Sequence, residues 1–162
     1  IILVVTYPFM KRITHWPQLF LGITFNWGVI MGWTSVSESL SPVIFMIYLS
    51  CIFWTLGYDT VYGYQDIVDD KIIGIKSTAV LFEKNPKTAI YTCYIISFLL
   101  MFMAMIWIES NYKTFLVFLC AVMLGIVLLG KLNLREVQSC ASFFLANKYI
   151  GFLAVLALAL SI

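Results

Sequence analysis

Residues 88–108 read TAIYTCYIISFLLMFMAMIWI, a stretch of 21 residues without a charged side chain. About 20 predominantly apolar residues suffice for an α-helix to cross the hydrocarbon core of a bilayer. The whole chain has a matching composition, since 62% of its 162 residues are hydrophobic, 11% are charged and the mean hydropathy is +0.98. An ordinary soluble domain is about 45–50% apolar and about 25% charged. The sequence therefore predicts a protein whose main solvent is lipid.

Apolar stretches on both sides of residues 88–108 predict further membrane-spanning helices. They cover residues 19–33, 43–57, 114–130 and 149–162. The last stretch is too short to span, so we expect its helix to begin before Lys148, with Asn147 and Lys148 at the membrane surface. The apolar run at residues 1–6 is interpreted as the end of a helix whose first part is absent. The expected fold class is all-α, a polytopic transmembrane helical bundle truncated at its N-terminus.

Basic residues are distributed unevenly between the two predicted sides of the membrane. Tracing alternate loops, including polar connections at residues 10–18 and 131–148, leaves only Lys113 on one side. The other side collects Lys11, Arg12, Lys71, Lys76, Lys84, Lys87, Lys131, Arg135 and Lys148. This asymmetry predicts that the second side faces the cytoplasm, or the matrix in a mitochondrion. The net charge of only +2 predicts no nucleic acid as a partner.

An acidic segment follows the apolar stretch at residues 43–57 on that same side. Residues 58–78 read YDTVYGYQDIVDDKIIGIKST and contain four of the eight acidic residues of the chain. If the helix continues through this segment, its 100° per residue brings four side chains onto one face. These are Asp59, Tyr62, Asp66 and Asp70, whereas Asp69 points about 80° away.

The acidic face predicts a metal site. Asp66 and Asp70 are i,i+4 neighbours with Cβ atoms about 5–6 Å apart, so their charges repel unless a cation lies between them. Mg²⁺ suits this arrangement, because it commonly binds one or two carboxylates together with substrate phosphates. The alternative is a solvated acidic loop between two spans. The position of Asp59 directly after an apolar stretch favours a functional role, because such carboxylates usually face a cavity.

Three basic residues on the same side, Lys11, Arg12 and Lys76, provide the opposite charge. A diphosphate needs both a metal and basic groups, since negative charge develops on it when its carbon–oxygen bond breaks. The alternative role for Lys11 and Arg12 is simple anchoring at the membrane surface.

The acidic segment resembles the second aspartate-rich motif of UbiA-type intramembrane prenyltransferases. That motif has the form D-x-x-Y-x-x-x-D-x-x-x-D and is matched by Asp59, Tyr62, Asp66 and Asp70. Two further blocks, IGIKST at residues 73–78 and YPFMKRITHWPQLFLG at residues 7–22, are similar to the 4-hydroxybenzoate polyprenyltransferase branch of the family. By this resemblance, residues 1–162 are the C-terminal part of a single membrane prenyltransferase domain.

The resemblance implies a reaction and roles for the site residues. A polyprenyl diphosphate held through Mg²⁺ would ionise, and the resulting allylic cation would alkylate 4-hydroxybenzoate ortho to its hydroxyl in ubiquinone biosynthesis. Asp66 and Asp70 would hold the metal with help from Asp59, and Tyr62 would lie beside the reacting centre. Lys11, Arg12 and Lys76 would contact the diphosphate or the aromatic carboxylate. The location would be the bacterial or the mitochondrial inner membrane.

The sequence departs from the family at one point. The family carries a first motif of form N-D-x-x-D-x-x-x-D, and this sequence has none. The remaining acidic residues are isolated: Glu38, Glu83, Glu109 and Glu136. We therefore predict that the first motif lies in a missing N-terminal portion and that this chain alone is inactive. An accessory membrane subunit and a segment of an ion-coupled transporter are the alternatives.

Overall fold

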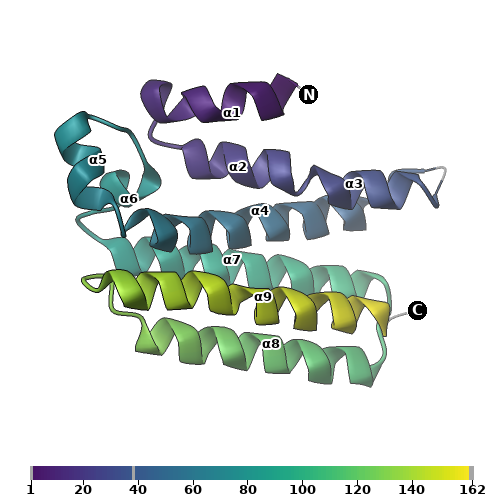
Figure 1. Ribbon diagram of the computed structural model, residues 1–162. Helices are drawn as coiled ribbons and strands as arrows, with labels where there is room; N and C mark the ends of the chain where they lie inside the picture. Colours follow the sequence, from purple (N-terminus) through teal and green to yellow (C-terminus); the bar gives the residue numbers. More distant parts are fainter. Residues whose placement is uncertain (1, 38, 161–162) are drawn as a thin grey trace.

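The computed structural model describes residues 2–37 and 39–160 of the chain, and these residues form nine α-helices and no strand (Figure 1). Residues 1, 161 and 162, at the ends of two predicted apolar stretches, and Glu38 lie outside the described residues. The helices are α1 (Ile2–Ile13), α2 (Pro17–Phe25), α3 (Trp27–Thr34), α4 (Pro42–Gly63), α5 (Ile67–Ile73), α6 (Thr78–Leu81), α7 (Pro86–Trp107), α8 (Tyr112–Lys131) and α9 (Val137–Ala159).

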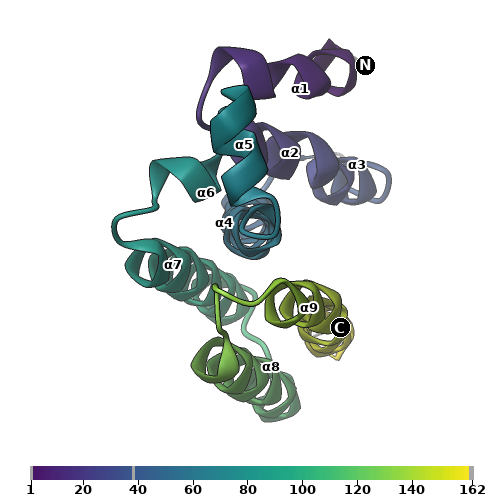
Figure 2. The same cartoon turned by 60° about the vertical axis from the view of Figure 1, so that its left-hand side comes forward.

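The long helix α4 is the centre of the molecule. Figure 1 shows α4, α7, α8 and α9 lying side by side, with α2–α3 and then α1 stacked along the other side of α4. Viewed after the turn of Figure 2, α7, α8 and α9 form one group below α4. The short helices α5 and α6 lie at the left-hand end of the bundle in Figure 1.

Within the described residues, four helices are long and apolar enough to cross a membrane: α4, α7, α8 and α9. Two of them, α4 and α7, begin with a proline, because Pro42 and Pro86 each occupy a first turn where no backbone donor is needed. The Ser41 hydroxyl accepts a hydrogen bond from the Val43 N–H at 3.4 Å. The predicted fold class, an all-α transmembrane bundle, is confirmed.

The outer surface of these helices is apolar, as a lipid-facing surface must be. Leu99, Leu116, Phe152 and Val155 all have more than half of their surface exposed. Exposure of these apolar side chains to water would be unfavourable, whereas contact with lipid is not.

The predicted span at residues 19–33 is wrong as a single helix. The helix is interrupted at Asn26, which separates α2 from α3, and neither helix alone is long enough to cross a membrane. Asn26 explains the break, because its side-chain amide donates to the Gly22 carbonyl at 2.8 Å and to Thr55 Oγ1 at 2.9 Å. An asparagine that bonds to nearby backbone competes with the helical ladder.

Two predicted polar connections are also shorter than expected. Helix α1 continues past Pro8 to Ile13, so Lys11 and Arg12 lie in its last turn and not in a loop. A proline in a membrane helix removes one backbone donor without necessarily ending the helix. Helix α9 begins at Val137, which confirms a start before Lys148 but places Lys148 on the helix itself.

Asn147 does not lie at the membrane surface as predicted. It is only 3% exposed, inside the bundle. Its Oδ1 accepts hydrogen bonds from Trp54 Nε1 of α4 at 2.9 Å and from the Tyr94 hydroxyl of α7 at 2.5 Å. These partners compensate the amide for the loss of water, so burial is favourable.

Candidate active site

The acidic segment folds as two helices and not as one. Helix α4 ends at Gly63, a turn follows, and α5 begins after Asp66. The predicted continuous face through residues 59–70 is therefore wrong. Gly63 lies against α6, where a Cβ atom would come within 3.3 Å of the Ala79 side chain. Close packing favours glycine there, and glycine is also a poor helix former, so the helix ends at this position.

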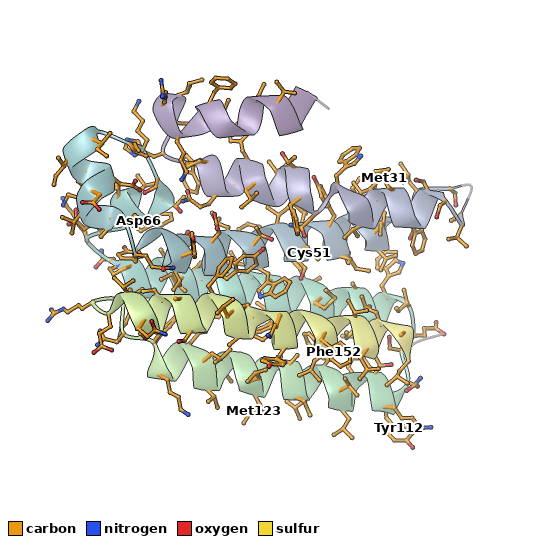
Figure 3. All side chains as sticks on the ribbon, in the orientation of Figure 1. Met31, Cys51, Asp66, Tyr112, Met123 and Phe152 are labelled. Carbon is orange, nitrogen blue, oxygen red and sulfur yellow. The ribbon has the colours of Figure 1, made fainter. Side chains whose placement is uncertain are left out.

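Asp66 and Asp70 lie one helical turn apart. The Asp70 N–H donates to the Asp66 carbonyl at 2.8 Å, and Figure 3 places Asp66 at the end of the bundle that carries α5 and α6. Desolvation raises the pKa of the Asp70 carboxyl, and the charges of Asp66 and Asp69 act in the same direction. Lys11 and the Ser77 hydroxyl act in the opposite direction. A cation beside Asp70 would relieve the desolvation and the repulsion.

Lys11 connects the two parts of the acidic segment electrostatically. Its charge acts on Asp70 of α5 and also on Asp59, a half-buried residue in the last turns of α4. Its charge therefore influences carboxylates from both helices. Arg12 is exposed beside it in the last turn of α1.

Lys76 joins the end of α1 to the loop before α6. Its backbone N–H donates to the Lys11 carbonyl at 2.9 Å, and its Nζ donates to the Ile13 carbonyl at 3.2 Å. One of the three ammonium protons is therefore directed at the backbone, and the other two remain for a ligand or water. The predicted basic residues Lys11 and Lys76 are thus held next to each other.

Tyr62 lies one turn beyond Asp59 on α4 and packs on α9. Its ring centroid is 4.6 Å from that of Phe144, and 45% of the residue is exposed. The tyrosine therefore contacts α9 on one side and is exposed on the other.

The metal-ligand set is not assembled by the described residues alone. Among residues 2–37 and 39–160, no group of three His, Cys, Asp or Glu side chains lies close enough to hold a metal ion. The donor chemistry nevertheless fits Mg²⁺, because two carboxylates one turn apart with phosphate oxygens are an ordinary Mg²⁺ environment. The assignment of Asp59, Asp66 and Asp70 to the metal stays a prediction.

Sequence reasoning did not identify the buried polar residues that hold the loop before α6. The Gln18 Oε1 accepts from the Thr78 N–H at 3.0 Å, and the Thr60 and Thr78 hydroxyls are 2.6 Å apart. All three residues are buried, and they join α2, α4 and α6 beneath the acidic segment. The sequence block IGIKST ends at Thr78 and so indicated this residue, but it did not show that Thr78 contacts Gln18 and Thr60.

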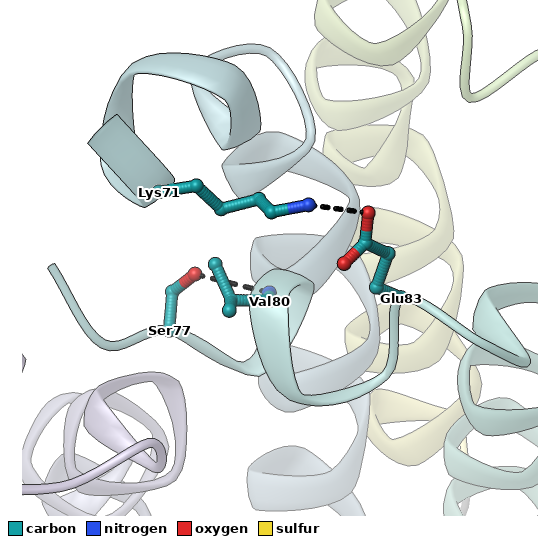
Figure 4. Close-up of polar contacts among 4 residues, drawn as sticks. All are labelled: Lys71, Ser77, Val80 and Glu83. Atoms are coloured by element: carbon teal, nitrogen blue, oxygen red, sulfur yellow. Dashed lines mark hydrogen bonds and ion pairs between the residues drawn. The ribbon is translucent and has the colours of Figure 1, made fainter. Parts of the chain in front are cut away.

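Figure 4 shows an ion pair on the outside of this region. Lys71 Nζ of α5 lies 2.7 Å from Glu83 Oε1, in the turn after α6. Nearby, the Ser77 hydroxyl accepts from the Val80 N–H at 3.3 Å and caps α6. Both charged side chains of the pair are about half exposed, so the pair fixes α5 only weakly.

The sequence of residues 1–159 matches the UbiA prenyltransferase family. The chain belongs to this family. It is 39% identical over 155 residues to the 4-hydroxybenzoate octaprenyltransferase of Psychromonas ingrahamii, covering 94% of this chain and 53% of that protein. It is 36% identical over 160 residues to the mitochondrial 4-hydroxybenzoate polyprenyltransferase of Drosophila melanogaster, covering 98% of this chain and 41% of that protein.

The mitochondrial 4-hydroxybenzoate polyprenyltransferase of Rattus norvegicus is 56% identical over 88 residues, which are 54% of this chain and 24% of the rat protein. In these three alignments, the chain therefore spans between about a quarter and about half of the length of its relatives. No solved structure matches it.

Proposed function

We propose that this chain is the part of a 4-hydroxybenzoate polyprenyltransferase that carries the second aspartate-rich motif. The reaction would transfer a polyprenyl group from polyprenyl diphosphate to the ring of 4-hydroxybenzoate, an early step in ubiquinone biosynthesis. The carbon–oxygen bond of the donor breaks, a carbon–carbon bond forms ortho to the hydroxyl, and the ring releases a proton.

One observation carries the proposal: carboxylates and a lysine that belong to different helices lie at the same end of a spanning helix, where the lysine charge acts on the carboxylates. Asp66 and Asp70 lie one turn apart, and Lys11 acts on Asp70 as well as on Asp59. A diphosphate held through a metal needs both signs of charge at the membrane surface, while its apolar tail needs the bundle. The names of the relatives, both bacterial and mitochondrial, support the same substrates.

The residues divide the work by their chemistry. Asp66 and Asp70, with Asp59 in support, would hold Mg²⁺, which when bound neutralises charge that develops on the leaving diphosphate. Lys11, Arg12 and Lys76 would bind the diphosphate or the carboxylate of 4-hydroxybenzoate. Tyr62 would lie beside the reacting carbon, where the face of its ring favours positive charge.

The proposal includes a location in the membrane. The acidic end would face the cytoplasm of a bacterium or the matrix of a mitochondrion, because basic loops favour that side. Phosphate oxygens of the donor and water would complete the ligand set of the metal.

The test is to substitute single aspartates in the active protein and to assay each variant in membranes. Asp66→Asn and Asp70→Asn should each reduce Mg²⁺-dependent prenylation of 4-hydroxybenzoate on the order of a hundredfold or more. Asp69→Asn is the matched control, because Asp69 belongs to the same acidic run but not to the predicted ligand set. Wild-type rates in the Asp66 and Asp70 variants would refute the proposed site.

A further inference from the structure

Three spanning helices meet at one buried polar contact. The Asn147 side-chain oxygen accepts hydrogen bonds from the Trp54 indole at 2.9 Å and from the Tyr94 hydroxyl at 2.5 Å. The Asn147 amide donates to the Phe143 carbonyl at 2.8 Å. We call Trp54, Tyr94 and Asn147 the Asn147 cluster. Because an amide oxygen has two lone pairs, both of its acceptor positions are used to hold aromatic rings.

Two glycines fix the positions of those rings. A Cβ atom at Gly57 would lie 2.9 Å from Cε2 of Tyr94, and one at Gly151 would lie 2.6 Å from Cη2 of Trp54. Each ring therefore packs directly on the backbone of a neighbouring helix while its polar atom bonds to Asn147. The Trp54 ring is held from two directions, which leaves it little freedom to change its orientation.

Trp54 forms part of the wall of a large apolar cavity of about 760 Å³. The cavity lies between α3, α4, α7, α8 and α9, and Gly151 also belongs to its wall. Along α4 the wall runs from Trp54 back to Ile44, which is about 15 Å at 1.5 Å per residue. Figure 3 shows Cys51, another wall residue, on the middle of α4.

Trp54 is the residue of the α4 wall that lies closest along the helix to the acidic end. Asp59 follows it by five residues, or about 7.5 Å along the helix axis. The cavity therefore extends away from the carboxylates, and its first aromatic surface on α4 is the Trp54 ring.

Aromatic rings continue from Trp54 to the acidic end. The centroid of Tyr58 is 5.3 Å from that of Trp54, and the centroid of Phe144 on α9 is 5.5 Å from that of Tyr58. Phe144 in turn contacts Tyr62, the tyrosine of the acidic segment, at 4.6 Å. An unbroken line of aromatic contacts thus joins the cavity to the end of α4 where the carboxylates lie.

We propose that Trp54 is a specificity-determining residue that guides the prenyl chain of the donor from the acidic end into the apolar cavity. In this proposal Asn147 is a positioning residue, which acts by holding the Trp54 ring. The proposal rests on the proposed function, because it takes the donor to be a prenyl diphosphate. If the Asn147 cluster only stabilised the packing of the helices, the Trp54 ring would not need to line the cavity.

The test compares Trp54→Phe with Trp107→Phe. Trp107 is the matched control, because it lies 58% exposed at the end of α7 and does not line the cavity. In membranes containing the active protein, KM is measured for geranyl, farnesyl and geranylgeranyl diphosphate. Trp54→Phe should raise KM for the longest donor about tenfold, while KM for 4-hydroxybenzoate changes less than about twofold. Trp107→Phe should change neither.

Asn147→Leu tests the positioning role separately. It removes the acceptor but leaves Trp54 in place, so it should raise the same donor KM in the same order of chain lengths. A purely structural role would instead lower kcat for all donors alike, or lower the amount of folded protein. Equal KM values for every donor in wild type and Trp54→Phe would overturn the proposal, even if Asn147→Leu failed to fold.

A binding measurement separates this inference from the proposed function. Trp33 also lines the cavity, so the measurement is made in a Trp33→Phe background. In that background geranylgeranyl diphosphate should change the tryptophan emission of the parent protein and of Trp107→Phe, but not of Trp54→Phe. If that pattern holds and no variant prenylates 4-hydroxybenzoate, the guiding role stands and the proposed acceptor is wrong. If prenylation is normal and the emission change survives in Trp54→Phe, the proposed function stands and the guiding role is wrong.

Discussion

The Asn147 cluster and the acidic segment are both polar, yet they are built in opposite ways. In the cluster, neutral groups of three helices satisfy one another inside the bundle, with Asn147 only 3% exposed. In the acidic segment, like charges lie close together at the surface, and desolvation raises the pKa of Asp70. Satisfied polar groups stabilise a fold, whereas neighbouring carboxylates destabilise it until a ligand binds. The difference predicts that overpacking the first region lowers stability, whereas loss of a carboxylate from the second lowers the rate of the reaction more than the stability.

A large effect on stability is expected at Gly57, one of the two glycines that pack on rings of the cluster. Gly57→Ala would place a Cβ atom 2.9 Å from Tyr94, so it should destabilise the bundle by about 1–3 kcal/mol. Thermal unfolding in detergent measures the change. Gly130→Ala is the control, because no atom lies within 4 Å of a Cβ there, and it should be neutral or slightly stabilising. Equal loss in both variants would show that the ring contact is unimportant.

A smaller effect on stability is expected at the contact between Thr60 of α4 and Thr78 of α6. Thr78→Val removes the 2.6 Å contact between the Thr60 and Thr78 hydroxyls. The Thr60 hydroxyl keeps its hydrogen bond to the Leu56 carbonyl, so the loss should be that of one hydrogen bond, about 0.5–1.5 kcal/mol. Thr88→Val, at an exposed position in α7, is the matched control. The unfolding temperatures of both variants decide whether the loop before α6 is held by this contact.

The ion pair on the outside of the acidic segment should matter less. Lys71→Ala and Glu83→Gln each remove the pair, but both side chains are about half exposed, so each variant should lose about 0–1 kcal/mol. Unfolding at low and high salt provides the check, since salt screens an exposed pair. A loss comparable with that of Gly57→Ala would contradict the contrast between the two regions.

The smallest effect is a pH dependence that reverses the usual role of a carboxylate. Folding raises the pKa of Asp70 above its ordinary value of 3.8, chiefly through desolvation. Its contribution to stability is therefore present below pH 3.8 and is lost as the pH rises through the raised pKa. Asp70→Asn should be slightly more stable than the wild type at pH 7 without Mg²⁺, and the two should converge in acid. Lower stability of Asp70→Asn at pH 7 would refute the assigned direction.

The spanning helices could be predicted from the sequence because their signal is local. Residues 88–108 have no charged side chain. Pro42 and Pro86 favour a helix start whatever contacts the helix later makes with other parts of the chain. The break at Asn26 could not be predicted in the same way. It depends on Thr55, a partner on another helix that the sequence does not reveal.

The candidate site was predictable only in part, for the same reason. The one-turn spacing of Asp66 and Asp70 follows from local geometry, and the sequence motif indicated which residues to examine. The turn after Gly63 depends on the closeness of Ala79. The burial of Asn147 depends on Trp54 and Tyr94, which belong to two other helices. Contacts between helices thus explain the break at Asn26, the turn after Gly63 and the burial of Asn147.

The central claim is that Asp66 and Asp70 hold Mg²⁺ for a prenyl diphosphate. The most direct measurement is the affinity for geranylgeranyl diphosphate, with and without Mg²⁺, in membranes containing the active protein. We predict that Mg²⁺ strengthens binding about tenfold or more in the wild type and in Asp69→Asn, but has no effect in the double variant Asp66→Asn, Asp70→Asn. The same Mg²⁺ dependence in the double variant would contradict the claim.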